Sequence, residues 1–214
     1  MRADAHISMA RADVRMGQLS RHVAEKFEGG RAYAVTTGLG LPRTWCLSTA
    51  AVLAGFGKGL AETTNVTDAS QRLRSATSEA RAALAATCDN LVERVLPDAT
   101  LVALLLSEGS LHVMSAGPGR VYVQREGRPK RLTARDEQKG GLLKARPSIC
   151  STPVEPGDLV LAGSVTAFSV SSIARAVSVL NEDPSTAPSV LGSLLIEPAG
   201  RAGVGAAAIV LRVR

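Results

Sequence analysis

Aromatic residues are rare in this sequence of 214 residues, since Phe, Tyr and Trp together make up only 3% of it. The six aromatic side chains are Phe27, Tyr33, Trp45, Phe56, Tyr122 and Phe168. Apolar residues of all kinds still reach 45%, so a hydrophobic core must consist mainly of Val, Leu, Ile and Ala. The chain is long enough to bury such a core in one large domain, or in two small ones at most.

Cysteine and long apolar runs are also scarce. The three cysteines, Cys46, Cys88 and Cys150, are too few and too widely spaced for a disulfide framework or a Cys-x-x-Cys metal site. No apolar run approaches the roughly 18–20 residues of a membrane-spanning helix, and the first residues lack the apolar stretch of a secretory signal. We therefore expect a soluble cytoplasmic protein, with Cys46 and Cys88 in the core and Cys150 as the most reactive thiol.

Positive charge is concentrated in one segment. The chain carries 25 Lys and Arg against 19 Asp and Glu, a net charge of +6. Residues 125–146 hold eight of these cations (Arg125, Arg128, Lys130, Arg131, Arg135, Lys139, Lys144 and Arg146) against Glu126, Asp136 and Glu137. Such a segment is typical of a solvated loop, or of a surface for acidic or phosphorylated partners. It contains no aromatic residue on which a base could stack, which disfavours nucleic acid.

The hydrophobic pattern predicts many strands and a few long helices. Residues 1–29 are expected to form a weakly structured arm or a first strand, and residues 30–214 one domain. Short apolar or alternating runs predict strands at Arg31–Thr37, Thr44–Leu53, Thr100–Leu106, Leu111–Ser115, Arg120–Arg125, Leu159–Ala162 and Ala206–Val213. Apolar residues at three- and four-residue steps predict helices at Asp68–Val95, Phe168–Leu180 and Ala187–Ile196.

Two local features have simple structural explanations. Gly55–Gly59 contains a Gly-Lys pair, but Lys58 is followed by Gly59 and not by Ser or Thr, so this segment is interpreted as a flexible turn and not as a phosphate-binding loop. His112 alternates with Leu111 and Val113, which predicts a solvent-facing position on a strand.

Three segments carry a longer pattern. In the run Asp98–Asp136, two predicted strands are followed by the corner Gly117-Pro118-Gly119-Arg120; Pro153–Ala167 reads PVEPGDLVLAGSVTA, and Gly205–Val213 reads GAAAIVLRV. In this order they resemble the metal-dependent Ser/Thr protein phosphatases (the PPM, or type 2C, family), which have a Gly-Asp-Ser-Arg corner, a Pro-Gly-Asp strand leading to Ser-Asp-Gly, and a last strand opened by Asp-Asn. The resemblance extends over residues 30–213. Arg31–Val35 stands where the family reads Asn-Glu-Asp-Ala-Tyr-Ala-Val, and Trp45–Glu62 where it reads Val-Ala-Asp-Gly-x-Gly-Gly.

The resemblance implies an α+β fold, a four-layer α-β-β-α sandwich with two antiparallel sheets face to face and helices on both outer faces. Family members bind two Mn²⁺ or Mg²⁺ ions through aspartates, since hard cations require anionic oxygen ligands. Those aspartates correspond here to Arg31, Ala50, Pro118, Val165 and Val204, none of them acidic. We therefore expect no catalytic residue, no bound metal and no cofactor. Arg120 retains the arginine of the corner, and Glu62 corresponds to an acidic residue after the Gly-rich segment.

These features favour a catalytically inactive PPM-type pseudophosphatase that serves as a regulatory or protein-binding module. Its partner would be a phosphoprotein, a kinase or another signalling protein. The candidate binding residues are Arg120, Arg128, Lys130 and Arg131. One alternative is a weak or unconventional Mn²⁺-dependent Ser/Thr phosphatase, and another is a nucleic-acid binder that uses residues 125–146.

Overall fold

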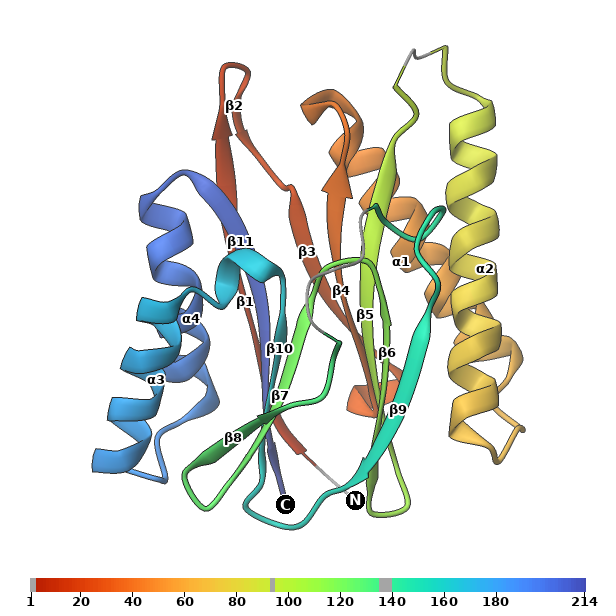
Figure 1. Ribbon diagram of the computed structural model, residues 1–214. Helices are drawn as coiled ribbons and strands as arrows, with labels where there is room; N and C mark the ends of the chain where they lie inside the picture. The colour runs from red at the N-terminus through yellow and green to blue at the C-terminus, as the bar shows by residue number, and fades with distance from the viewer. Residues whose placement is uncertain (1–2, 93–94, 135–139) are drawn as a thin grey trace.

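The computed structural model describes residues 3–92, 95–134 and 140–214, in which two antiparallel sheets pack face to face (Figure 1). One sheet has the strand order β2-β1-β11-β10-β7-β8, and the other has the order β3-β4-β5-β6-β9. The strands are β1 (Ala3–Val14), β2 (Gly17–Leu19), β3 (His22–Phe27), β4 (Ala32–Leu39), β5 (Asp98–Ser107), β6 (Ser110–Ala116), β7 (Arg120–Arg125), β8 (Arg128–Arg131), β9 (Ser148–Pro153), β10 (Leu159–Gly163) and β11 (Val204–Val213).

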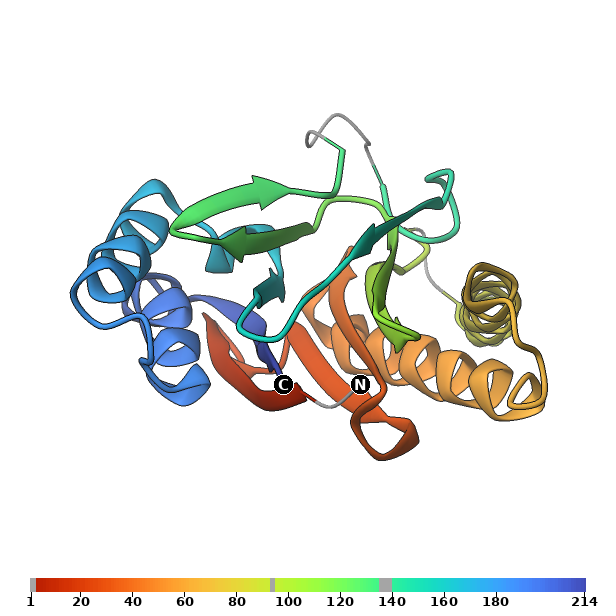
Figure 2. The ribbon, with the colours of Figure 1, turned by 90° about the horizontal axis from the view of Figure 1, so that it is seen from below.

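Helices cover the outer face of each sheet, as Figure 2 shows. Helices α1 (Trp45–Glu62) and α2 (Ala69–Asp89) lie on the five-stranded sheet, while α3 (Val170–Glu182) and α4 (Pro188–Arg201) lie on the six-stranded sheet. Short 3-10 turns occur at η1 (Glu28–Gly30), η2 (Pro42–Thr44) and η3 (Val165–Ala167). The predicted four-layer α-β-β-α sandwich is confirmed.

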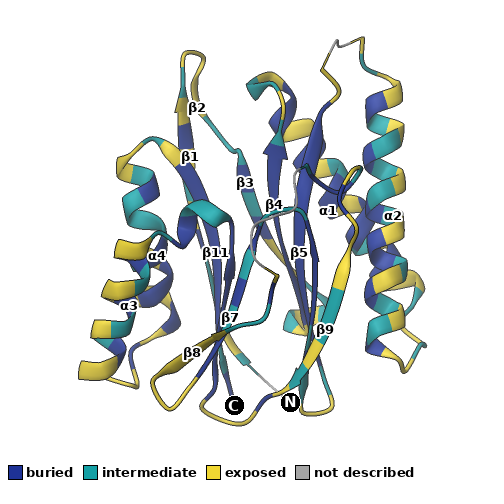
Figure 3. Cartoon of the chain, viewed as in Figure 1, coloured by how far each residue is buried: buried dark blue, intermediate teal, exposed yellow. Residues whose placement is uncertain are grey.

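The core consists of three aliphatic layers. One lies between the sheets and includes Leu104, Val160 and Ile209; the other two lie between each sheet and its helices. Strand β5 is buried along nearly its whole length because both of its faces are covered, which explains its continuous apolar run (Figure 3). Small residues such as Ala103 and Ala207 fill positions where aromatic residues would be too large.

The strand predicted at Thr44–Leu53 is wrong, since this run forms the first half of α1. The helix continues with small and apolar residues as far as Glu62. The prediction failed because the periodicity of a short apolar run does not distinguish a buried helix segment from a buried strand. Gly55 and Gly59 lie inside this helix and not in a turn. A Cβ at Gly55 would lie 2.8 Å from the Ala80 Cα, and one at Gly59 would lie 2.6 Å from the Ala76 Cα. These glycines therefore allow α1 and α2 to approach backbone to backbone.

The N-terminal residues contribute strands to both sheets. β1 pairs with β11 from Ala3↔Val213 to Ala12↔Val204, while β3 pairs with β4 in the other sheet. Helix α2 ends at Asp89 and not at Val95, because Asp89 and Asn90 favour a helix end over its continuation. Within the described residues, no helix combines the length and the apolar character that a membrane crossing would require.

Candidate functional site

Strand ends from both sheets meet at the upper end of the sandwich in Figure 1. Pro118 lies between β6 and β7, Val165 follows β10, and Val204 opens β11. The strand register brings Pro118 and Val165 to the same end, because Gly163 at the end of β10 pairs with Arg120 at the start of β7. Three of the five positions that were matched to metal-binding aspartates are therefore located at this end.

The other two positions lie elsewhere, and their assignment is corrected. The Arg31 carbonyl accepts a hydrogen bond from the Leu106 amide at 2.8 Å, which places Arg31 at the opposite end of the sheet. Ala50 lies on the exposed side of α1. Ligands of one metal centre must converge within a few ångströms, and neither residue can converge with Val165.

The strand register indicates better matches. The family segment Val-Ala-Asp-Gly-x-Gly fits Val35–Gly40, with Thr37 at the position of the aspartate. His22 lies opposite Thr37 in the β3–β4 pair, and it opens its strand as the first family aspartate is expected to do. The sequence signal was present in Thr37-Gly38-Leu39-Gly40, but only the hydrogen-bonded register shows that His22 is its neighbour.

His22 connects the two sheets through its imidazole ring. Its Nδ1 lies 2.9 Å from the Thr37 Oγ1, and its Nε2 lies 3.3 Å from the Val204 carbonyl oxygen. Because a carbonyl only accepts, Nε2 carries the proton and the Thr37 hydroxyl donates to Nδ1. Burial, reinforced by the nearby Arg21 charge, lowers the pKa of His22 to about 4. The ring is therefore neutral at pH 7.

Neighbouring polar groups at this end also bond to one another. The Ala207 amide donates to the Ser164 Oγ at 3.2 Å, and the Ser164 Oγ lies 2.9 Å from the Thr166 Oγ1. Arg120 donates from Nη1 to the Phe168 carbonyl at 2.6 Å, so its guanidinium stabilises the turn after β10. These contacts engage the hydroxyls of Ser164 and Thr166 and one guanidinium nitrogen of Arg120 within the protein.

The carboxylates near this end do not converge. Asp13 of β1 is exposed beside Gly203, the residue before Val204. Asp98 is buried, and its oxygens accept from the backbone amides of Ala99, Gly141 and Leu143. Glu62 lies at the opposite end, since Arg72 bonds both the Glu28 carboxylate and the Leu60 carbonyl near the end of α1; the Glu62 carboxylate is 3.7 Å from the Lys58 Nζ. In the described ranges, no three His, Cys, Asp or Glu side chains come together in a way that could hold a metal ion. The described donor set therefore does not fit a two-metal centre; Asp136 and Glu137 fall outside it.

Some cations of the basic segment form contacts within the protein, and others are exposed. Arg125 forms two hydrogen bonds with the Asp158 carboxylate at 2.9 and 2.7 Å, and a third with Glu155 at 2.9 Å. Arg131 donates to the Ala134 carbonyl at 2.6 Å. Arg128 and Lys130 are exposed on β8, an edge strand of the six-stranded sheet. Arg135 and Lys139 lie outside the described residues.

The environment of Cys88 agrees with the prediction, whereas those of Cys46, Cys150 and His112 differ from it. Cys88 is buried as predicted, but Cys46 is exposed on the first turn of α1, because the predicted strand there is a helix. Cys150 is half-buried between the sheets, and burial raises the pKa of its thiol, which opposes reactivity. His112 is half-buried on the face that α2 covers, where burial lowers its pKa and the Asp68 carboxylate opposes this effect.

Solved structures provide the strongest likeness to this chain. The PPM Ser/Thr phosphatase MsPP from Mycobacterium smegmatis is 20% identical with a TM-score of 0.77, over 98% of each chain. The Mycobacterium tuberculosis Ser/Thr phosphatase PstP/Ppp is 18% identical with a TM-score of 0.81, over 99% of each chain. The S. agalactiae Ser/Thr phosphatase is 14% identical with a TM-score of 0.81, over 100% of each chain. The sequence matches no protein-family model and no curated protein. Over its whole length, the chain has the fold of the PPM Ser/Thr protein phosphatases.

Proposed function

We propose that this protein is a catalytically inactive PPM-type pseudophosphatase that acts by binding a protein partner in phosphorylation-dependent signalling. One observation supports the proposal above all. Where a metal-dependent phosphatase needs converging carboxylates, this chain has His22, Thr37, Pro118, Val165 and Val204. The retained fold still provides two sheets and four helices as a binding surface.

The lost carboxylates also explain how the fold remains stable without metal. Like-charged carboxylates at one site repel each other unless cations neutralise them. In this chain a neutral imidazole bridges the same gap, from Thr37 in one sheet to Val204 in the other. Metal should therefore add nothing to the stability of the folded state.

Calorimetric titration with Mn²⁺ and a p-nitrophenyl phosphate assay on the same sample test the proposal. We expect no saturable metal binding, no metal-dependent hydrolysis, and a melting temperature that is equal in Mn²⁺ and in EDTA. The Arg120→Ala variant is the control for the alternative of a weak phosphatase. Mn²⁺-dependent turnover that this variant loses would overturn the proposal.

A further inference from the structure

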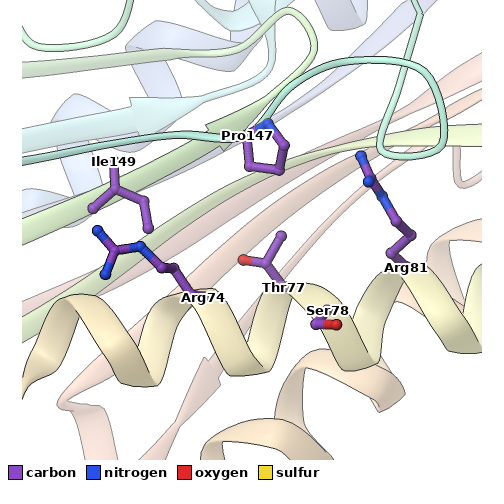
Figure 4. Close-up of a pocket in the computed structure, with 6 residues that line it drawn as sticks. All are labelled: Arg74, Thr77, Ser78, Arg81, Pro147 and Ile149. Atoms are coloured by element: carbon purple, nitrogen blue, oxygen red, sulfur yellow. The ribbon is translucent and has the colours of Figure 1, made fainter.

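A groove lies between helix α2 and strand β9, on the outer side of the five-stranded sheet. It encloses a cavity of about 390 Å³ lined by Arg74, Thr77, Ser78, Arg81, Pro147 and Ile149. Figure 4 shows the Arg74 side chain extending from α2 to lie beside Ile149, with Pro147 across from Thr77. The groove thus combines a helix face with the margin of a sheet.

Within the part of the chain that the structure describes, that margin is a strand edge with no further strand paired to it. β9 is the last strand of its sheet, whereas β3, at the other edge, packs against β1 and β11. The Val154 amide donates to the Gly109 carbonyl at 2.9 Å, and this bond sets the alternation of the β6–β9 ladder. The amides and carbonyls of Ile149 and Ser151 therefore point away from β6. Among the described residues, neither amide donates to another segment.

The two arginines of the groove differ in their contacts. Arg81 donates from Nε to the Leu142 carbonyl at 2.8 Å and from Nη2 to the Ala145 carbonyl at 2.9 Å, so it fixes the loop beside the groove. Arg74 is exposed and has no hydrogen-bond or ion-pair partner among the described residues. No carboxylate is found among the described lining residues. The groove is therefore positively charged, and one guanidinium in it is available.

We propose that the α2–β9 groove binds an extended acidic segment of a partner protein, which adds to the edge of β9 as a further strand. Main-chain bonds to Ile149 and Ser151 would hold the segment, and Pro147 and Pro153 would limit its length. Every second side chain of the added strand would point to the side that faces α2, which is also the side to which the Ile149 side chain points. An acidic side chain placed opposite Ile149 then meets Arg74. This inference rests on the proposed function, since it specifies where the partner binds.

Fluorescence anisotropy with labelled peptides and the full chain tests this binding. The probe is an acetylated peptide of alternating Glu and Val, and its first control has Gln in place of Glu. We expect the Gln peptide to bind about tenfold more weakly, and the Arg74→Glu variant to lose about tenfold for the Glu peptide. Arg15→Glu makes the same charge change at an exposed position of the turn between β1 and β2, on the other sheet, and it should alter binding by less than about twofold.

The main-chain contribution needs a separate test. The Ser151→Pro variant lacks an amide that points away from β6, and it keeps every hydrogen bond between β9 and β6. In the second test the protein is unchanged, and the Glu-Val peptide is N-methylated at its valines so that it lacks these main-chain donors. Both changes should weaken binding. Full binding of the methylated peptide, no binding of the Glu peptide at millimolar concentration, or an equal loss in Arg15→Glu would overturn the groove proposal. None of these results depends on metal, so Mn²⁺-dependent hydrolysis would overturn the proposed function separately.

Discussion

The upper end of the sandwich and the α2–β9 groove use polar side chains in opposite ways. At the upper end, His22, Thr37 and Ser164 are buried and bonded to neighbours within the protein. In the groove, Arg74 is exposed without a partner among the described residues, beside a strand edge. Polar groups that are satisfied internally contribute to stability, whereas an exposed unpaired cation contributes little. The difference indicates that the polar groups of the upper end contribute to the fold, whereas the groove offers a cation for the proposed binding.

The largest expected effect concerns the close packing of the upper end. A Cβ at Gly163 would lie 2.5 Å from the Ala207 carbonyl oxygen and 3.1 Å from the Phe168 ring. Because a backbone atom in a central strand cannot move aside, Gly163→Val should lower the free energy of unfolding by about 3 kcal/mol or more. Urea denaturation provides the measurement. Ser78→Val on the exposed face of α2 is the control, with an expected change below about 0.5 kcal/mol. Equal midpoints for both variants would contradict the contrast between the two regions.

The pH dependence of stability tests the buried imidazole. The pKa of His22 is about 4 in the folded protein against 6.5 in the unfolded chain. Below pH 6.5 the unfolded state binds a proton that the folded state excludes, so stability falls as the pH falls from 6.5 toward 4. The total decrease in the free energy of unfolding from this one group is about 3 kcal/mol. Chemical denaturation at several pH values measures it.

The control for this pH effect is His22→Asn, which lacks the titrating ring. The variant is less stable at pH 7, but its stability should change less between pH 6.5 and 4. His112 gives a further effect in the same direction, since burial also lowers its pKa. A wild-type slope that persists in His22→Asn would assign the pH dependence to other groups.

Much of the fold was predictable because its signals are local. The alternation in the first half of β6 and in β7, the turn at Glu108–Ser110, and the apolar run of β5 each follow from neighbouring residues. Helix α1 was missed because its seam with α2 consists of Gly and Ala, whose small size is explained only by a second helix far along the chain.

The site was harder to predict because it depends on register. Pro118, Val165 and Val204 each border a clear strand pattern, and the structure places all three at the upper end. Arg31 and Ala50 were wrong because matching along the chain carries no information about which strand ends meet. The contact of His22 with Val204 joins residues 182 positions apart, and no local pattern predicts such a contact.

A moderate effect is expected from the hydroxyl that bonds to His22. Thr37→Val keeps the shape of the side chain but removes the donor to Nδ1, which leaves a buried acceptor without a partner. The expected loss is about 1–2 kcal/mol at pH 7, measured by urea denaturation. Thr37→Ser retains the hydroxyl, so this variant should keep most of the stability that Thr37→Val loses. No difference between Val and Ser at this position would show that the hydrogen bond does not stabilise the bridge between the sheets.

The smallest effect is expected at Arg74, and its neighbour in the groove supplies the comparison. Arg81→Ala should cost about 1–2 kcal/mol, because it leaves the buried Leu142 carbonyl without a donor. Arg74→Ala removes an exposed cation without a partner among the described residues and should change the free energy of unfolding by less than about 0.5 kcal/mol. Urea denaturation of both variants under the same conditions measures this difference. A loss at Arg74 as large as that at Arg81 would mean that Arg74 stabilises the fold, and the contrast between the groove and the upper end would then fail.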